Sequence, residues 1–138
     1  MRILVSACLL GLACRYDGKS KPHPKVVELS KSEQLYPFCP ECMGGLPTPR
    51  PPAEIRGDRV INAEGADVTA QYRKGAEEAL RLCRLYGIQR AILKAKSPSC
   101  GKGAVYDGSF RKTLTEGDGI TAALLMANGI EVITENEL

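Results

Sequence analysis

Short continuous apolar runs alternate along this chain with segments of helical character. Such runs are typical of strands buried on both faces, and strands that alternate with helices indicate a parallel sheet with crossover helices. The expected strands span 2–10, 34–38, 90–95 and 130–134, with a minor extended piece at 58–62, and the expected helices span 25–33, 68–87 and 118–129. We therefore predict an α/β fold of three layers, Rossmann-like or flavodoxin-like, with a short parallel sheet of about four main strands and helices on both faces.

The length and composition are those of an ordinary globular domain. The chain has 138 residues, 43% of them hydrophobic and 25% charged, which is enough for one hydrophobic core. We therefore expect a single α/β domain over residues 1–138. The net charge of +3 is small and comes without a dense run of Lys and Arg, so it favours a small-molecule partner over nucleic acid.

The apolar N-terminus, "MRILVSACLLGLAC", has some features of a signal peptide. Its basic part is a single residue, however, and Arg15, Asp17 and Lys19 follow the apolar run at once. No stretch of about 18 apolar residues is present, so a membrane span is not expected. We interpret the N-terminus as a first buried strand and expect a cytoplasmic protein.

Two long segments show no clear periodicity. Residues 40–57 are rich in proline and glycine, and we expect an ordered loop there, because long loops in compact domains are usually functional or disordered. Residues 97–117 are polar and glycine-rich, and "YDGS" within them offers a hairpin turn. In the two longer helices, Thr69 and Asp118 are the expected N-cap residues.

Three of the six cysteines follow three different predicted strands. Cys8 lies at the end of the first strand, Cys39 at the end of the second, and Cys100 in the loop after the third. The carboxyl ends of parallel strands meet at one edge of a sheet, and ligands of such sheets bind beyond that edge. We therefore expect the three thiols to converge on one patch.

Converging thiols in a reducing compartment indicate a metal or catalytic role more often than structural disulfides. Zinc would need a fourth ligand, which Cys42 or Cys14 could supply. An iron–sulfur cluster held by only three cysteines would leave one iron open as a Lewis acid. The "CPEC" pair, Cys39 and Cys42, also fits a thiol–disulfide redox protein, but such a motif should open a helix, and the glycines and proline at 44–47 follow too soon for one.

Two oxygen-bearing side chains flank these cysteines. Glu41 lies two residues after Cys39, and Ser97 lies three residues before Cys100. A carboxylate beside a metal site can move protons if its pKa rises toward neutrality. The alternatives are a solvated loop charge for Glu41 and, for Ser97 and Ser99, hydrogen bonding within the turn.

The remaining cysteines and the single histidine are weaker candidates. Cys83 lies on the apolar face of the 68–87 helix, where a free cysteine acts as a small hydrophobe, so we expect it in the core. Cys14 is expected to support its loop or to be a secondary thiol. His23 stands between two prolines and is expected to be a solvated loop residue, which disfavours a zinc site built on histidine.

Four blocks of the sequence together resemble the DUF523 family, in the same order and over nearly the whole chain. They are "SACLLG" at 6–11, "CRYDG" at 14–18, "FCPE" with "GGLPTPRPPAEI" at 38–41 and 44–55, and "SPSCG" at 97–101. The resemblance implies a thiouracil desulfidase with a [4Fe-4S] cluster held by three cysteines, which match Cys8, Cys39 and Cys100. It also implies that Glu41 and Ser97 are catalytic, moving protons and helping to position a water.

The chemistry that the resemblance implies is the non-redox removal of sulfur from a thiolated nucleobase, a nucleoside or a similar thioamide. The thiocarbonyl sulfur would bind the open iron, water would replace it at carbon, and the sulfur would leave as sulfide. Soft iron suits a sulfur ligand. Cys42 stands where this family usually has an apolar residue, so it is an extra thiol that could compete as a ligand or form a disulfide with Cys39 in air.

Overall fold

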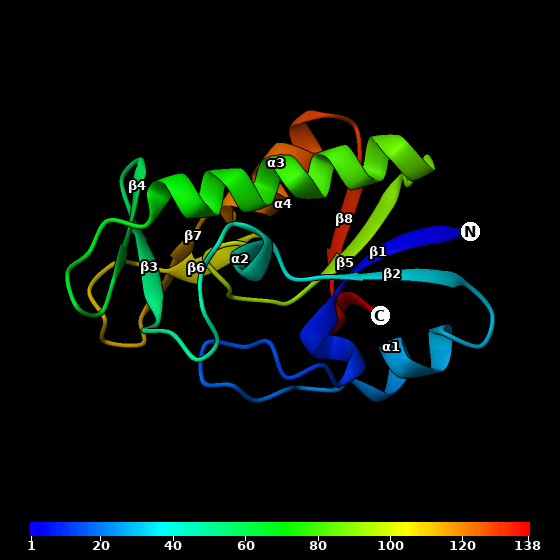
Figure 1. Cartoon of the computed structure of the whole chain (residues 1–138), viewed down its shortest axis with the longest axis horizontal. Coiled ribbons are helices and arrows are strands. Elements are labelled where there is room, and N and C mark those ends of the chain that lie inside the picture. The colour runs from blue at the N-terminus through cyan, green and yellow to red at the C-terminus, as the bar shows by residue number, and fades with distance from the viewer.

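A computed structural model describes all 138 residues of the chain. Its central feature is a sheet of four parallel strands in the order β2-β1-β5-β8 (Figure 1). In chain order, the elements are β1 (Arg2–Ser6), the 3-10 helix η1 (Ala7–Leu10), α1 (Pro24–Leu29), β2 (Gln34–Phe38), α2 (Pro40–Met43), β3 (Ala53–Arg56), β4 (Arg59–Asn62), α3 (Thr69–Tyr86), β5 (Arg90–Leu93), β6 (Ala104–Tyr106), β7 (Leu114–Glu116), α4 (Ile120–Ala127), β8 (Glu131–Thr134) and the 3-10 helix η2 (Glu135–Glu137). Two small antiparallel sheets, β3–β4 and β6–β7, lie to one side. None of the helices has the length and apolarity that crossing a membrane requires.

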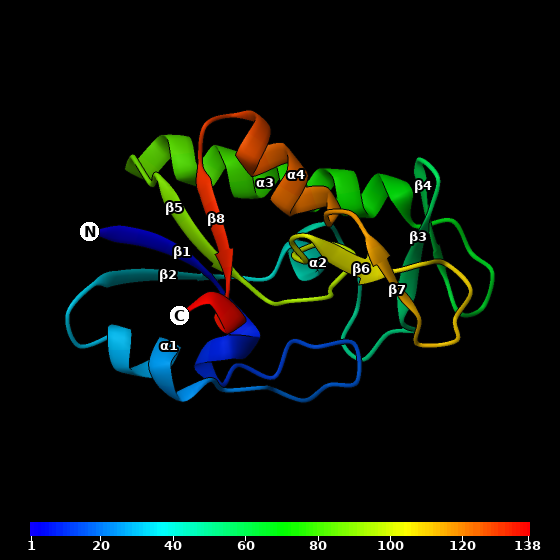
Figure 2. The ribbon, with the colours of Figure 1, turned by 180° about the vertical axis from the view of Figure 1, so that it is seen from behind.

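Helices cover both faces of the central sheet (Figure 2). On one face, Leu4 of β1 and Leu93 of β5 pack with buried residues of α3 and α4. On the other face, Ile3 and Ile92 of the same strands pack with η1 and with Val26 of α1. Successive strand residues point to opposite faces, so a strand covered on both sides needs apolar residues throughout. The predicted α/β fold, with its parallel sheet and two helical layers, is confirmed.

The first strand is shorter than its apolar run. β1 ends at Ser6, and the run continues as η1, which ends at Gly11 with a φ of 97°. Cys8 and Leu9 of η1 are buried in the same cluster as residues of β1. A continuous apolar run does not distinguish a strand from a buried helical turn, so the second half of the strand predicted at 2–10 is wrong. Cys8 follows the strand and does not end it.

The predicted loop at 40–57 is wrong, because it contains two elements. α2 begins at Pro40, where the fixed φ of proline suits the first helical position, and Cys39 is its N-cap residue. β3 pairs with β4, the piece expected at 58–62. With only four residues, α2 is too short to show a helical period in the sequence. The "CPEC" pair therefore does open a short helix, contrary to the prediction.

The N-caps of α3 and α4 differ from those expected. Val68 precedes α3 as its N-cap residue, and Thr69 is the first helical residue. The carboxylate of Asp67 accepts hydrogen bonds from the Thr69 backbone N–H at 2.9 Å and from its hydroxyl at 2.6 Å. Gly119 is the N-cap residue of α4. The carboxylate of Asp118 instead accepts a hydrogen bond from the backbone N–H of Gly103, just before β6. Neither Thr69 nor Asp118 is therefore the N-cap residue that the sequence predicted.

α3 connects the central sheet to the small β3–β4 sheet, and α2 lies directly against it (Figure 1). A β-carbon on Gly75 of α3 would overlap the carbonyl oxygen of Pro40, and one on Gly44 would overlap that of Gln71. The two backbones touch because neither glycine has a side chain. This contact fixes α2, and with it Glu41, beyond the carboxyl end of β2.

Candidate active site

A cavity of about 600 Å³ lies beyond the carboxyl ends of the parallel strands. Residues that follow each strand of the sheet line it, namely Ala7 after β1, Cys39 after β2, Lys94 after β5 and Glu135 after β8. Residues of α2, β3 and the β6–β7 hairpin supply further walls. Ligands of parallel α/β sheets bind at this edge, so the cavity is the candidate active site.

The three cysteines predicted to converge all line this cavity. Cys8 comes from η1, Cys39 is the N-cap residue of α2, and Cys100 lies in the turn after β5. Cys8 and Cys100 are buried, and Cys39 is half-buried. Burial raises the pKa of the Cys100 thiol to about 12, because a thiolate there would lose its hydration. The structure brings the three thiols together, and their role as ligands stays a prediction.

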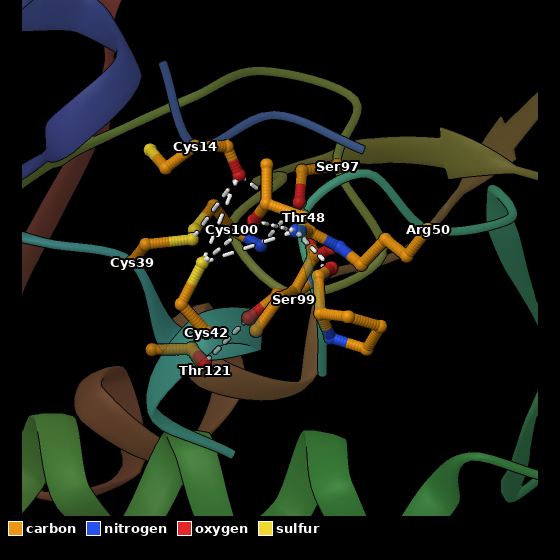
Figure 3. A network of polar contacts seen from close by, with 11 residues as sticks. Cys14, Cys39, Cys42, Thr48, Arg50, Ser97, Ser99, Cys100 and Thr121 are labelled. Atoms are coloured by element: carbon orange, nitrogen blue, oxygen red, sulfur yellow. Dashed lines mark hydrogen bonds and ion pairs between the residues drawn. The ribbon is translucent and has the colours of Figure 1, made fainter. Parts of the chain in front are cut away.

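A fourth thiol, that of Cys14, joins them. Cys14 lines the cavity, and its thiol interacts with the thiols of Cys39 and Cys8. The contact with Cys39 lowers the pKa of Cys14, but the contact with Cys8 and burial outweigh it and raise the pKa to about 11. The backbone carbonyl of Cys14 also accepts weak hydrogen bonds from the Cys39 and Cys42 thiols, at 3.8 and 3.9 Å (Figure 3). Cys14 is therefore a secondary thiol of the site.

Cys42 is not among the residues that line the cavity. Its Sγ lies 3.4 Å from the Thr48 hydroxyl and 3.8 Å from Nη1 of Arg50. Burial raises the pKa of its thiol. No three His, Cys, Asp or Glu side chains are grouped closely enough to hold a single metal ion. The thiols of the site therefore surround a cavity and are too far apart to bind one metal ion.

Glu41 is paired with a buried arginine. It lies in the first turn of α2, and its Oε2 accepts a hydrogen bond from Nε of Arg50 at 2.8 Å. The Arg50 side chain is 4% exposed and that of Glu41 is 14% exposed, so little water competes with the pair. Glu41 also lines the cavity. The alternative of a solvated loop charge at this position is wrong.

Arg50 holds together several segments around the site. Besides Glu41, its guanidinium donates hydrogen bonds to the carbonyls of Cys14 at 3.0 Å and Pro47 at 3.2 Å, and to the Thr48 hydroxyl at 3.1 Å (Figure 3). The planar guanidinium group can serve several acceptors at fixed angles. The sequence pattern does not single out this residue. The one sequence feature that could have indicated it is a lone cation between Pro49 and Pro51, in the same segment as Glu41.

Ser97 both shapes its turn and faces the cavity. Its Oγ accepts hydrogen bonds from the backbone N–H groups of Ser99 at 3.1 Å and Cys100 at 3.0 Å. This is the turn hydrogen bonding expected as an alternative, and it fixes the backbone that carries Cys100. Both N–H groups approach the lone pairs of the oxygen, so the Ser97 hydroxyl proton stays free to donate. Ser99 is buried and bonds to Thr121 of α4 at 2.7 Å instead.

Tyr72 and His23 also line the cavity, although the helical spacing of Tyr72 favours a core position and the two prolines that flank His23 favour a solvated loop. Tyr72 of α3 is buried, and burial, followed by the nearby Glu41 carboxylate, raises the pKa of its phenol. Nδ1 of His23 is buried without a hydrogen-bond partner. A helical period records that a side chain faces inward, and it does not distinguish a core position from a cavity wall.

The fold and the cavity define a class of protein: a three-layer α/β protein whose sheet carries, at its carboxyl edge, a thiol-lined site with a half-buried carboxylate. Within that class, the chain belongs to the 2-thiouracil desulfurase family, whose model matches residues 3–137.

Two similar proteins support this assignment. The protein YbbK of Bacillus subtilis (strain 168) is 42% identical over 146 residues, which covers 99% of this chain and 97% of YbbK. A solved structure described as the [4Fe-4S]-dependent thiouracil desulfidase TudS (DUF523Vcz) is 50% identical and has a TM-score of 0.95, covering 99% of this chain and 92% of that chain. The resemblance to the DUF523 family is confirmed, as is the family-level prediction of a thiouracil desulfidase.

Proposed function

We propose that this protein is a [4Fe-4S]-dependent desulfidase that converts the C=S group of a thiolated nucleobase or nucleoside into C=O and releases sulfide. The observation that carries the proposal is the gathering of thiols from three strand ends, with the Glu41–Arg50 pair, around one cavity. The 50% identity to the desulfidase TudS supports the same assignment. The overall reaction balances as C=S plus H₂O giving C=O plus H₂S, with no change in redox state.

Cys8, Cys39 and Cys100 are the proposed cluster ligands. All three line the cavity and come from separate segments, so together they can surround a group larger than one ion. Thiolates are the usual ligands of iron–sulfur clusters, and this donor set fits. Cys14 lines the cavity as well, and Cys42 does not. We assign neither of these two thiols to the ligand set.

When bound, the cluster supplies a Lewis-acidic iron that polarises the carbon–sulfur bond of the substrate. Glu41 is placed to take a proton from the water that attacks this carbon, because its carboxylate lines the cavity and is held at a fixed position by Arg50. Ser97 is placed to donate a hydrogen bond from its hydroxyl to a substrate atom, since its oxygen already accepts two backbone hydrogen bonds. The cysteines hold the cofactor, and the oxygen-bearing side chains handle the protons.

Anaerobic reconstitution with iron and sulfide, followed by incubation with 2-thiouracil, tests the function. We expect about four irons and four sulfides per chain, a broad visible absorption band, and formation of uracil with sulfide. A colourless protein that takes up one zinc and leaves 2-thiouracil intact would overturn the proposal.

Glu41→Gln tests the proposed proton transfer within the same assay. The variant keeps a hydrogen-bonding side chain of the same size, so we expect full cluster loading with kcat lowered by about 100-fold or more. Glu64→Gln, at an exposed turn, is the matched control and should keep full turnover. Undiminished turnover of Glu41→Gln would remove Glu41 from the mechanism.

We further propose that the protein works in the cytoplasm on a small thiolated base or nucleoside. All six cysteines are free thiols, and the cytoplasm keeps thiols reduced.

A further inference from the structure

Three residues other than glycine have a left-handed backbone, and all three line the cavity. Their φ angles are 69° for Lys96, 58° for Phe110 and 57° for Lys112. This conformation is unfavourable for a residue with a β-carbon, and it persists where the surrounding structure imposes it, often at ligand sites. Phe110 and Lys112 lie in the loop between β6 and β7. The shape of this hairpin tip is therefore imposed by contacts.

Those contacts come from β3, which lies beside the hairpin (Figure 2). Glu54 is buried, and its Oε1 accepts hydrogen bonds from the backbone N–H groups of Gly108 at 3.0 Å and Phe110 at 3.1 Å. Nε of Arg56 donates to the Gly108 carbonyl at 2.7 Å. Gly108 fits tightly as well, since a β-carbon there would lie 2.8 Å from the carbonyl oxygen of Ile55. β3 thus holds the backbone on either side of Phe110 in place.

The ring of Phe110 has a cation on one side and lies at the cavity. The guanidinium carbon of Arg56 lies 5.4 Å from the ring centroid. Phe110 lines the cavity, and Arg56 is not among the lining residues, so the guanidinium does not stand between the ring and the cavity. The ring itself is partly exposed. It therefore offers a flat apolar surface, carried on a backbone that β3 holds in place, to whatever enters the cavity.

We propose that Phe110 is a substrate-binding residue that stacks on the planar ring of the substrate, and that Glu54 is the positioning residue that orients it. The inference rests on the proposed function, which makes the substrate a thiolated nucleobase. Aromatic side chains stack on the π-face of a base without reading its substituents. Stacking persists unchanged while the thiocarbonyl reacts, so it should lower KM and leave kcat nearly unchanged.

Steady-state kinetics of the reconstituted enzyme with 2-thiouracil give the first test. Phe110→Leu is expected to raise KM by about tenfold with kcat within about twofold of wild type, as expected from the energy of base–aromatic stacking. Phe110→Tyr keeps a ring and is expected to keep KM within about twofold. A KM of Phe110→Leu equal to that of wild type, in an enzyme that turns over normally, overturns the inference and leaves the proposed function standing.

Fluorescence gives a second test that does not depend on turnover, because the chain contains no tryptophan. Phe110→Trp places a single tryptophan at the cavity, whose emission can be excited apart from that of the tyrosines, and uracil, the expected product ring, should quench it in a saturable way. The control is Tyr86→Trp, because Tyr86 is exposed on α3 and its ring lies tilted against that of Tyr36, outside the cavity. Quenching of Phe110→Trp alone supports stacking, even if the loaded enzyme fails to convert 2-thiouracil and the proposed function falls. Equal quenching of both variants overturns the stacking.

Glu54 is tested by a conservative pair of substitutions. Glu54→Gln keeps an Oε1 that accepts both backbone hydrogen bonds and is expected to keep the wild-type KM. Glu54→Ala removes the acceptor and is expected to raise KM toward the Phe110→Leu value while kcat and iron content stay near those of wild type. A fall in kcat with unchanged KM in Glu54→Ala would overturn the positioning role.

Discussion

Arg50 is the residue on which the geometry of the candidate site depends most directly. Its guanidinium is buried and bonds to a carboxylate of α2, to a hydroxyl and a carbonyl of its own loop, and to the carbonyl of Cys14, which is distant in the sequence. Removing one partner of a buried ion pair leaves the other charge without compensation. Arg50 therefore affects stability and the position of Glu41 together.

We expect Arg50→Ala to lower the free energy of unfolding by about 3 kcal/mol, in line with the cost of breaking a buried pair. The kcat of Arg50→Ala should fall by about as much as that of Glu41→Gln. The double variant should be little slower than either single variant, because the two residues act as a unit. Urea unfolding and steady-state kinetics provide the measurements. Arg59→Ala, which removes the exposed pair with Asp67, is the control and should cost less than about 1 kcal/mol.

The six cysteines show how far the sequence alone can assign roles. Cys83 recurs at helical spacing with apolar residues, and the structure confirms that it belongs to the core, with 1% exposure. The meeting of Cys8, Cys39 and Cys100 at one cavity follows from a parallel sheet. The Glu41–Arg50 pair could not be predicted from the sequence, because it depends on the path of a loop whose residues show no periodic pattern.

Cys83→Ala separates a core thiol from the thiols of the site. We expect a loss of about 1–2 kcal/mol in the free energy of unfolding, since the substitution removes one buried sulfur atom and leaves a small cavity. Iron content after reconstitution should match wild type, because Cys83 packs between α3 and the sheet. Loss of iron from a variant that folds normally would contradict the core assignment.

At the scale of elements, the long helices and the parallel strands were predictable, but α2 and β3 were not. Both lie in a segment where prolines suppress any regular pattern, and both are stabilised by neighbours: α2 by α3, and β3 by β4. A short element is specified by tertiary contacts more than by its own residues. This matters here because α2 carries Glu41 and has Cys39 as its N-cap residue.

Gly75→Ala tests the contact between α2 and α3. Alanine favours an isolated helix over glycine by about 1 kcal/mol, so propensity alone predicts stabilisation. We expect destabilisation instead, together with lower kcat, because the new β-carbon would overlap the Pro40 carbonyl and push α2 away from α3. Urea unfolding and kinetics measure the two effects, with Lys74→Ala on the exposed side of α3 as the control. A more stable Gly75→Ala protein would contradict the close contact.

The start of α3 should make stability depend on pH. Hydrogen bonds from the Thr69 hydroxyl and backbone N–H, and then the contact with Arg59, lower the pKa of Asp67 to about 2, from an ordinary value of 3.8. A carboxyl group whose pKa is lowered by folding adds stability above its unfolded pKa, and this is lost as pH falls through its folded pKa. Asp67→Asn should therefore be less stable than wild type at pH 7, with the difference fading between about pH 4 and pH 2. Unfolding free energies across this range provide the measurement, and a difference that does not change with pH would contradict it.

At the scale of the whole molecule, the three proposed ligands come from segments that follow three different strands of the central sheet. A cluster bound to them would link these segments to one another. Cys8 follows β1, Cys39 follows β2, and Cys100 lies in the turn after β5 that leads on to the β6–β7 hairpin. A cofactor that binds the folded chain and not the unfolded one stabilises the whole protein by mass action. Stability and function are therefore linked through the same three thiols.

Cluster loading should consequently raise the melting temperature of the protein by about 10 °C, the shift expected for a few kcal/mol of linked binding energy in a domain of this size. Single alanine substitutions of Cys8, Cys39 and Cys100 should each abolish this rise, because each removes one of the proposed ligands. Cys42→Ala should keep it, since Cys42 is not among the residues that line the cavity and its thiol contacts Thr48 and Arg50. Anaerobic thermal denaturation of loaded and unloaded protein gives the comparison. A rise that survives Cys8→Ala but is lost in Cys42→Ala would move the metal from the proposed site to the "CPEC" pair and overturn the ligand assignment.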